Sequence, residues 1–263
     1  MDALRATSLS KVPEVTLGFW IIKILATTLG ETGGDAVTMS LQLGYAVGTA
    51  IFAVFFALTV TAQIRAPRFH PALYWATIVA TTTVGTTIAD FADRSMHIGY
   101  TGGSALLLTL LLVSLATWRL AEGSVAVETV ATPRVEAFYW VTILFSQTLG
   151  TALGDWMATA NGLGYGGSAL VFACALALLA LLYLCTKISR VALFWAAFIL
   201  TRPLGATLGD LLDKPHALGG FALSRAYASA ILAVIIVAAI IVLPQRAGRH
   251  PRRQGSVGKH VLF

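Results

Sequence analysis

One sequence pattern occurs four times along this chain of 263 residues. In each copy an aromatic–Trp pair is followed by a glycine ten residues after the Trp and by an aspartate fifteen residues after it. Such self-similarity indicates a repeat architecture, in which each copy is one structural unit. The landmarks are Trp20, Trp75, Trp140 and Trp195; Gly30, Gly85, Gly150 and Gly205; and Asp35, Asp90, Asp155 and Asp210.

Long apolar segments surround these landmarks and indicate that lipid is the solvent. Hydrophobic residues make up 57% of the chain and charged residues only 11%, with a mean hydropathy of +0.80. A helix needs roughly 20 mainly apolar residues to cross the hydrocarbon core of a bilayer. We expect eight such spans, over residues 14–35, 42–63, 71–92, 98–119, 135–156, 163–185, 190–211 and 219–243.

Two spans in each copy predict the fold. Because every unit crosses the membrane an even number of times, consecutive units share one orientation and form parallel repeats. We predict an all-α membrane protein with eight transmembrane helices, built from four two-helix repeats with pseudo-symmetry about the membrane normal. The expected transmembrane domain covers residues 1–243, with repeats at about 11–65, 66–120, 133–187 and 188–243, and residues 244–263 are expected to form a disordered basic tail.

The basic residues predict how the chain lies in the membrane. They gather at the N-terminus, after the even-numbered spans and in the tail, for example at Arg65, Arg119 and Arg246, whereas the opposite loops carry the aspartates. By the positive-inside rule, both termini are cytoplasmic. The net charge of +6 therefore reflects topology and does not support nucleic-acid binding. The expected partner is the lipid bilayer, and the sequence leaves cofactors and oligomeric state unknown.

The repeat resembles a family of bacterial membrane proteins described as four tandem repeats of unknown function. Each repeat of that family has two transmembrane regions and a characteristic tryptophan, to which Trp20, Trp75, Trp140 and Trp195 correspond. The resemblance covers about residues 11–243. It implies a bacterial inner-membrane location but no substrate, so function has to be argued from the residues.

The tryptophans and glycines have a structural explanation. Each Trp lies near the cytoplasmic start of an odd-numbered span, where headgroup anchoring and packing are expected. Each glycine is followed four residues later by a second small residue, and such pairs let helix backbones approach closely in lipid. Since the even-numbered spans also begin with glycines, we expect the two helices of a unit to pack tightly at their outer ends.

The aspartates lie about 22 Å along the helix axis from the tryptophans, near the outer edge of the hydrocarbon. In three units, polar residues precede the aspartate on the same helix face: Thr28 and Glu31, Thr83 and Thr86, and Thr148 and Thr151. The fourth unit instead has Pro203 and Ala206, and it places Arg202 where the others have Thr27, Thr82 and Gln147. We interpret Lys23 and Arg202 as counter-charges to buried carboxylates, because intramembrane charges rarely stay unpaired.

Glu31 and the four aspartates are therefore candidates for an acidic vestibule on the outer side. This favours an inner-membrane transporter or channel-like protein for a small cation, either a metal ion or a proton-coupled substrate. The alternative for each aspartate is that it ends its helix by bonding loop amides. The alternatives for the whole protein are a non-transporting scaffold or sensor, and an intramembrane enzyme or lipid-binding protein.

Two outer loops also carry residue types that bind divalent ions. These are Asp90, Asp93 and His97, and in the corresponding loop Asp210, Asp213 and His216; ordinary polar loops are the alternative. The chain has no nucleotide-binding glycine loop and no His-Glu-x-x-His or Gly-x-Ser-x-Gly motif. We therefore expect neither a primary pump nor a familiar intramembrane hydrolase, and we predict no enzymatic activity.

Overall fold

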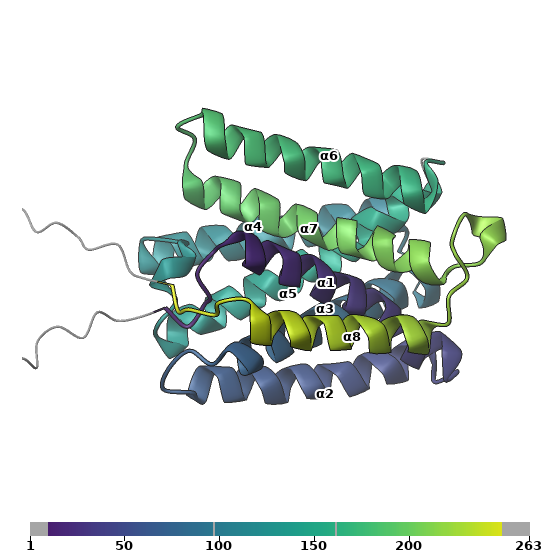
Figure 1. Cartoon of the computed structure of the whole chain (residues 1–263), viewed down its shortest axis with the longest axis horizontal. Helices are drawn as coiled ribbons and strands as arrows, with labels where there is room; N and C mark the ends of the chain where they lie inside the picture. The colour runs from purple at the N-terminus through teal and green to yellow at the C-terminus, as the bar shows by residue number, and fades with distance from the viewer. Residues whose placement is uncertain (1–9, 97, 161, 249–263) are drawn as a thin grey trace, which may run out of the picture.

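Eight long α-helices run side by side in the computed structural model of the protein, which describes residues 10–96, 98–160 and 162–248 (Figure 1). No strand forms in this part of the chain, so the predicted all-α fold is confirmed. The helices are α1 (Leu17–Asp35), α2 (Gly44–Arg65), α3 (Pro71–Asp90), α4 (Tyr100–Glu122), α5 (Pro133–Asp155), α6 (Gly164–Cys185), α7 (Arg190–Asp213) and α8 (Arg225–Val242).

The odd-numbered helices form a closed inner ring. Helix α1 packs against α3, α3 against α5, α5 against α7, and α7 against α1. Each even-numbered helix packs outside this ring against the odd helix of the following unit: α2 on α3, α4 on α5, α6 on α7 and α8 on α1. The expectation that the two helices of one unit pack at their outer ends is met only through the segment between them, for example where Gly48 of α2 lies against Thr38. The main partner of each even helix lies in the neighbouring unit.

The glycines of the repeat explain why the ring is so tight. A side chain at Gly30, Gly150 or Gly205 would overlap a residue of the next odd helix. Close backbone approach of this kind is what small residues permit in lipid. The four contacts follow one another around the ring: Gly30 against Thr82, Gly85 against Gln147, Gly150 against Arg202 and Gly205 against Thr27.

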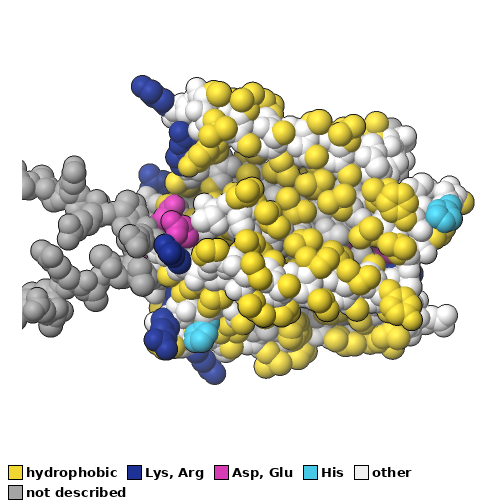
Figure 2. All heavy atoms as spheres, viewed as in Figure 1, with side chains coloured by type: hydrophobic (Ala, Val, Ile, Leu, Met, Phe, Trp, Pro, Cys, Tyr) yellow, Lys and Arg dark blue, Asp and Glu magenta, His cyan; other side chains and the backbone are white. Residues whose placement is uncertain are grey.

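The inner helices are more deeply buried than the outer helices. In the most apolar 18-residue stretch of each even helix only 11–22% of the residues are buried, compared with 72% for the stretch in α3 and 61% for that in α7. Apolar side chains cover the side of the bundle that Figure 2 shows. A surface of this composition on long helices fits contact with lipid rather than water.

Six of the eight helices are long and apolar enough to span a membrane: α2, α3, α4, α6, α7 and α8. Helices α1 and α5 are not among these six, and each contains three charged residues. In α1 these are Lys23, Glu31 and Asp35, and all three are buried inside the ring. Lipid would therefore not contact the three charged side chains of α1. Both α1 and α5 pack directly against helices that are long and apolar enough to span a membrane.

Aromatic rings close one end of the bundle in what we call the aromatic collar. The aromatic residue before each Trp contacts the Trp of the next unit, and Trp75, Trp140 and Trp195 are buried. The expected packing of the tryptophans is confirmed for these three, whose rings lie inside the protein and not on its surface. The centroid distances are 5.5 Å for Phe19–Trp75, 5.7 Å for Tyr74–Trp140, 6.3 Å for Tyr139–Trp195 and 5.7 Å for Phe194–Trp20.

Three chain segments cover the aromatic collar. Residues 10–14 pair with residues 246–248, for example through the Glu14 amide, which donates to the Arg246 carbonyl at 2.8 Å. The loop before α5 joins them, because the Lys11 amide donates to the Val130 carbonyl at 2.7 Å. Residues 244–248 are thus packed and not a free tail as expected, whereas residues 249–263 of the predicted tail lie outside the described residues. Both ends of the described chain reach the same end of the bundle, as an even number of crossings requires (Figure 1).

The opposite end differs between the units. Helices α1, α3 and α5 continue directly into five-residue π-helices, Ala36–Ser40, Phe91–Ser95 and Trp156–Ala160. Helix α7 instead remains α-helical to Asp213 and is followed by a short 3-10 turn, His216–Leu218. Single π-turns are rare and often occur at functional sites, and here each one begins directly after the repeat aspartate.

Candidate functional site

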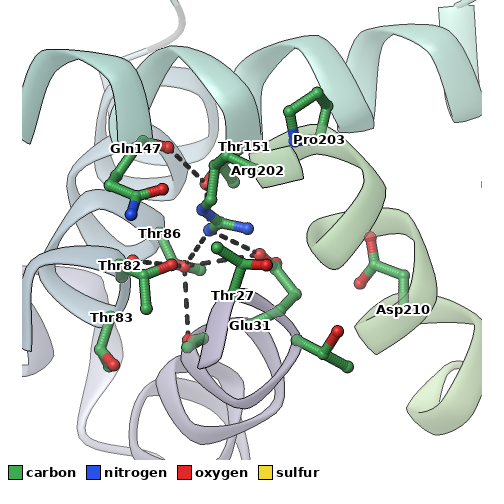
Figure 3. Close-up of polar contacts among 12 residues, drawn as sticks. Thr27, Glu31, Thr82, Thr83, Thr86, Gln147, Thr151, Arg202, Pro203 and Asp210 are labelled. Carbon is green, nitrogen blue, oxygen red and sulfur yellow. Dashed lines mark hydrogen bonds and ion pairs between the residues drawn. The ribbon is translucent and has the colours of Figure 1, made fainter. Parts of the chain in front are cut away.

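The centre of the ring is polar, and the fourth unit supplies the residue that closes it. At the position eleven residues after the Trp, the first three units carry Glu31, Thr86 and Thr151, all buried. Arg202 reaches this level from α7, and its Nη2 donates to Glu31 Oε2 at 2.9 Å and to the hydroxyls of Thr86 and Thr151, both at 2.5 Å (Figure 3). The fourth unit has Ala206 at the equivalent position. One guanidinium therefore joins all the other units, and the expected pairing of Arg202 with a carboxylate is confirmed.

Lys23 does not have the partner expected for it. Its Nζ donates to Thr201 Oγ1 at 3.1 Å and lies 3.9 Å from the centroid of the Phe198 ring. No carboxylate of the described residues forms an ion pair with it, although its side chain is fully buried. The interpretation of Lys23 as a counter-charge is wrong, because it lies two helical turns from Glu31 towards the aromatic collar and its polar partner is a hydroxyl group.

The four repeat aspartates converge at the other end of the ring in two bridged pairs. Lys214 Nζ lies 2.5 Å from Asp35 Oδ2 and 2.9 Å from Asp210 Oδ1. In the same way, Arg94 Nε lies 2.8 Å from Asp90 Oδ1, and Arg94 Nη2 lies 3.8 Å from Asp155 Oδ2. Each basic residue follows its own aspartate by four positions and reaches the aspartate of the next unit. The aspartates are therefore tied to one another across the units.

Acidic side chains outnumber basic side chains in this aspartate layer. Asp213 joins it through Arg225, whose Nε lies 3.1 Å from Asp213 Oδ2 and 3.7 Å from Asp35 Oδ2. Five buried carboxylates, those of Asp35, Asp90, Asp155, Asp210 and Asp213, thus face three basic side chains, those of Arg94, Lys214 and Arg225.

Lys214 is held in its charged form by this arrangement. Burial by itself would lower the pKa of its ammonium group, but the carboxylates of Asp210, Asp35 and Asp213 raise that pKa above its ordinary value. Lys214 therefore carries a proton at physiological pH and neutralises part of the layer.

Among the described residues, one group of carboxylates is close enough to hold a metal ion. One oxygen from each of Glu31, Asp35 and Asp210 lies within 4.8 Å of the others. The second oxygen of Asp35, Oδ1, is buried and has no hydrogen-bond partner in the described part of the chain. Carboxylate oxygens suit hard cations. In the conformation described, Lys214 pairs with Asp35 and Asp210, and Arg202 pairs with Glu31.

Four segments of the chain match the family model described as Repeat of Unknown Function (DUF347), at residues 18–69, 73–124, 138–189 and 193–246. The chain belongs to the DUF347 family. Each matched segment covers one helix of the inner ring and the outer helix that follows it. The family description names no activity, and neither a curated protein nor a solved structure matches the chain.

Among the described residues of this DUF347 protein, the members of the two loop sets predicted to bind metal do not come together as a metal site. His216 Nδ1 lies 2.9 Å from the Gly220 carbonyl oxygen, while Asp213 and Asp210 pair with Arg225 and Lys214. In the other loop, Asp90 pairs with Arg94, and Asp93 Oδ1 has no hydrogen-bond partner in the described part. His97 lies outside the described residues.

The predicted polar stripe of the DUF347 repeat is confirmed at Glu31, Thr86 and Thr151, which meet Arg202, and is wrong one turn earlier. The hydroxyls of Thr28, Thr83 and Thr148 donate to carbonyls of their own helices, those of Ile24, Val79 and Leu144, at 2.8–2.9 Å. The preceding position, occupied by Thr27, Thr82, Gln147 and Arg202, is the one that meets the neighbouring helix of the ring. No sequence signal pointed to this position, because its contact with the repeat glycine exists only in the closed ring.

Proposed function

We propose that this protein is a membrane transporter for a small cation, which enters from the aspartate end of the ring. The observation that carries the proposal is the aspartate layer, in which five buried carboxylates from successive units face three basic side chains. Intramembrane ionisable groups that face a bundle interior mark ion pathways in membrane proteins. Carboxyl groups that outnumber their basic partners in such a place can take up cations or protons.

A purely structural role does not account for this layer. Buried ion pairs contribute little net stability, because desolvation offsets the attraction, and apolar residues of similar volume often do as well. Four units that needed only to pack could therefore carry apolar residues at this level. The buried charge argues for a role in ion binding.

The arrangement suggests how the path is closed. A cation that reaches Asp35 and Asp210 competes with the ammonium of Lys214 for their carboxylates. Glu31, whose carboxylate lies close to both, is the next acidic residue along the ring towards the aromatic collar. Beyond it, the guanidinium of Arg202 bridges the ring. Movement of an ion past this level requires the Arg202–Glu31 ion pair to open. We therefore assign the described conformation to a closed state of the transporter.

The location that we propose is a bacterial inner membrane, with both termini in the cytoplasm. Lys and Arg side chains gather at the end of the bundle where the chain ends lie (Figure 2). This distribution follows the positive-inside rule. The basic residues before and after the loops at this end are Arg65, Arg68, Arg119, Arg134, Lys187 and Arg190.

Reconstitution into liposomes tests the proposal. We expect flux of protons or of at least one ion from a panel of mono- and divalent cations, and we expect Glu31→Gln and Asp90→Asn to abolish it while the protein stays folded. Glu122→Gln is the matched control, because Glu122 forms its 2.9 Å ion pair with the exposed Arg134 at the opposite end. Flux no greater than that of empty liposomes for the whole panel would rule out transport and leave two alternatives, a scaffold or sensor and an intramembrane enzyme or lipid-binding protein.

A further inference from the structure

A groove runs along the outside of the ring, between α6 and α1. It has a volume of about 970 Å³, and it is lined by residues of α1, α6 and α7 and of the segment that precedes α1. This volume lies at the upper end of the range for pockets that hold small molecules. Most of the wall is apolar, for example Ile24 on α1, Leu176 and Leu179 on α6, and Ala197 on α7. The groove therefore suits an apolar ligand.

The groove forms where the second half of the chain departs from the first. In the first half, α2 packs on α3 and also reaches α5. The equivalent helix of the second half, α6, packs on α7 and leaves α1 largely uncovered on this side. Trp20 borders the groove and is only partly buried. Trp75 and Trp195 donate their indole N–H groups to protein oxygens, but that of Trp20 has no acceptor among the described residues.

The length of the groove matches one leaflet of a bilayer. On α7 its lining residues run from Arg190, at the end of the bundle where the chain ends lie, to Thr201. This interval corresponds to about 16 Å along a helix axis. The hydrocarbon core of a bilayer is about 30 Å thick, so one leaflet contributes about 15 Å. The groove thus has the depth of a lipid acyl chain that extends from the interface to the middle of the membrane.

Three charged side chains line the groove at its interfacial end: Arg190, Glu14 and Glu128. No ion pair of the described residues includes any of them. The Arg190 guanidinium donates to the carbonyls of Tyr183 and Thr186, which leaves it with further N–H groups that can bind a phosphate. Figure 2 shows acidic and basic side chains close together at this end of the bundle. A ligand that carries both a phosphate and a cation matches this charge pattern.

We propose that this groove binds one phospholipid of the ethanolamine type, whose headgroup carries a phosphate and a primary ammonium. An acyl chain lies between α6 and α1, the phosphate pairs with Arg190, and the ammonium donates hydrogen bonds to Glu14 and Glu128. A choline headgroup has no N–H group to donate, and a purely anionic headgroup is repelled by the two carboxylates. The site lies outside the ring and goes beyond the proposed cation transport. Its tests measure lipid binding and not flux, so the two proposals can fail independently.

Lipid selectivity is the first test. The full chain is purified in detergent and titrated in native mass spectrometry with phosphatidylethanolamine, phosphatidylcholine and phosphatidylglycerol that carry the same acyl chains. We expect one retained lipid, with phosphatidylethanolamine bound about three- to tenfold more tightly than the other two. Affinity for either of the other lipids that equals or exceeds that for phosphatidylethanolamine would overturn the proposal, as would the absence of any retained lipid.

Matched variants locate the lipid. Ala180→Phe places a ring in the groove, and we expect it to weaken lipid retention by about tenfold or more. Ala177→Phe is the control, because Ala177 lies one turn away on α6, is exposed like Ala180 and does not line the groove. Thermal unfolding of both variants in detergent without added lipid verifies that they are folded. Equal retention of phosphatidylethanolamine by the two variants would overturn the site.

A second pair of variants tests the headgroup contact. Glu128→Gln should remove most of the preference for phosphatidylethanolamine over phosphatidylcholine, because it removes a carboxylate that accepts from the ammonium. Glu122→Gln should leave the preference unchanged, since Glu122 pairs with Arg134 and does not line the groove. The same preference in both variants and in the unchanged protein would overturn the assignment of the ammonium to Glu128.

Discussion

Arg202 is the residue by which the fourth unit departs most from the others. The three equivalent residues are Thr27, Thr82 and Gln147, which are all shorter and uncharged. The long guanidinium side chain crosses from α7 to Glu31 on α1 and to hydroxyls on α3 and α5. Ala206 stands where the other units have larger polar residues. One asymmetric residue thus closes a nearly symmetric ring.

Arg202→Met should destabilise the protein by about 3–5 kcal/mol, because it leaves the buried carboxylate of Glu31 without its cation. Adding Glu31→Gln in the same chain should recover much of this loss, since the neutral amide needs no counter-charge. Unfolding in detergent of both single variants and the double variant measures the coupling. Arg134→Met, which removes an exposed ion pair, should change stability by less than about 1 kcal/mol. Losses of equal size for Arg202→Met and Arg134→Met would contradict the central role of Arg202.

Gly150→Ala should cost about 1–3 kcal/mol, because the new methyl group would overlap the stem of Arg202 and approach Pro203 Cδ to 3.0 Å. Gly102→Ala is the control, since a Cβ at Gly102 on the outer helix α4 meets nothing within 4 Å. Thermal unfolding of both variants compares them directly. A Gly150→Ala protein as stable as Gly102→Ala would show that the ring is looser than described.

At the scale of elements, inner and outer helices serve different purposes. The inner ring carries the glycine contacts, the aromatic collar, the aspartate layer and the central arginine, whereas the outer helices present apolar side chains to the surroundings. Because each outer helix packs on the ring helix of the next unit, every unit is held by its neighbours. Two-helix units that share their main contacts in this way need the neighbouring repeats to complete their packing.

The aromatic collar makes a prediction at the same scale. Trp140→Ala should cost about 3–5 kcal/mol, because the ring is buried between Tyr74 and Tyr139 and leaves a cavity. Tyr183→Ala should cost much less, since Tyr183 is 53% exposed on the outer helix α6. Denaturation of the two variants in detergent distinguishes a collar from headgroup anchoring. Similar small losses in both variants would favour anchoring.

At the scale of the whole molecule, the bundle is closed by contacts between the first and the last units. Helix α1 packs against both α7 and α8, and residues 10–14 pair with residues 246–248. The two halves of the chain therefore meet along two opposite seams, at α3–α5 and α7–α1.

Residues 1–123 and 124–263, expressed as two chains, should assemble and copurify, because both seams bury large complementary surfaces. Affinity purification of one tagged half from membranes checks this. Introducing Leu at Gly85 and Gly205 should block assembly, since these glycines lie in the two seams against Gln147 and Thr27. Unchanged recovery of the second half in that variant would contradict the closed ring.

Much of the fold could be predicted from the repeat. Trp20 and its three equivalents fixed the number of units, and the apolar segments between them predicted the helices. The site was predicted in part: the ion pair of Arg202 and the gathering of the aspartates followed from their depth and charge. The isolation of Lys23 and the separation of His216 from Asp210 could not be predicted, because they depend on which helix faces which.

The sequence by itself determined the number, length and order of the helices, since apolar length and repeat register are local properties of the chain. The tertiary structure alone decided that the odd helices close into a ring and that each even helix packs on the next unit. It also decided that Lys214 and Arg94 bridge aspartates of different units. These contacts join residues far apart in the chain, and their energies depend on backbone approach at the glycines and on burial of charge, neither of which exists until the ring has closed.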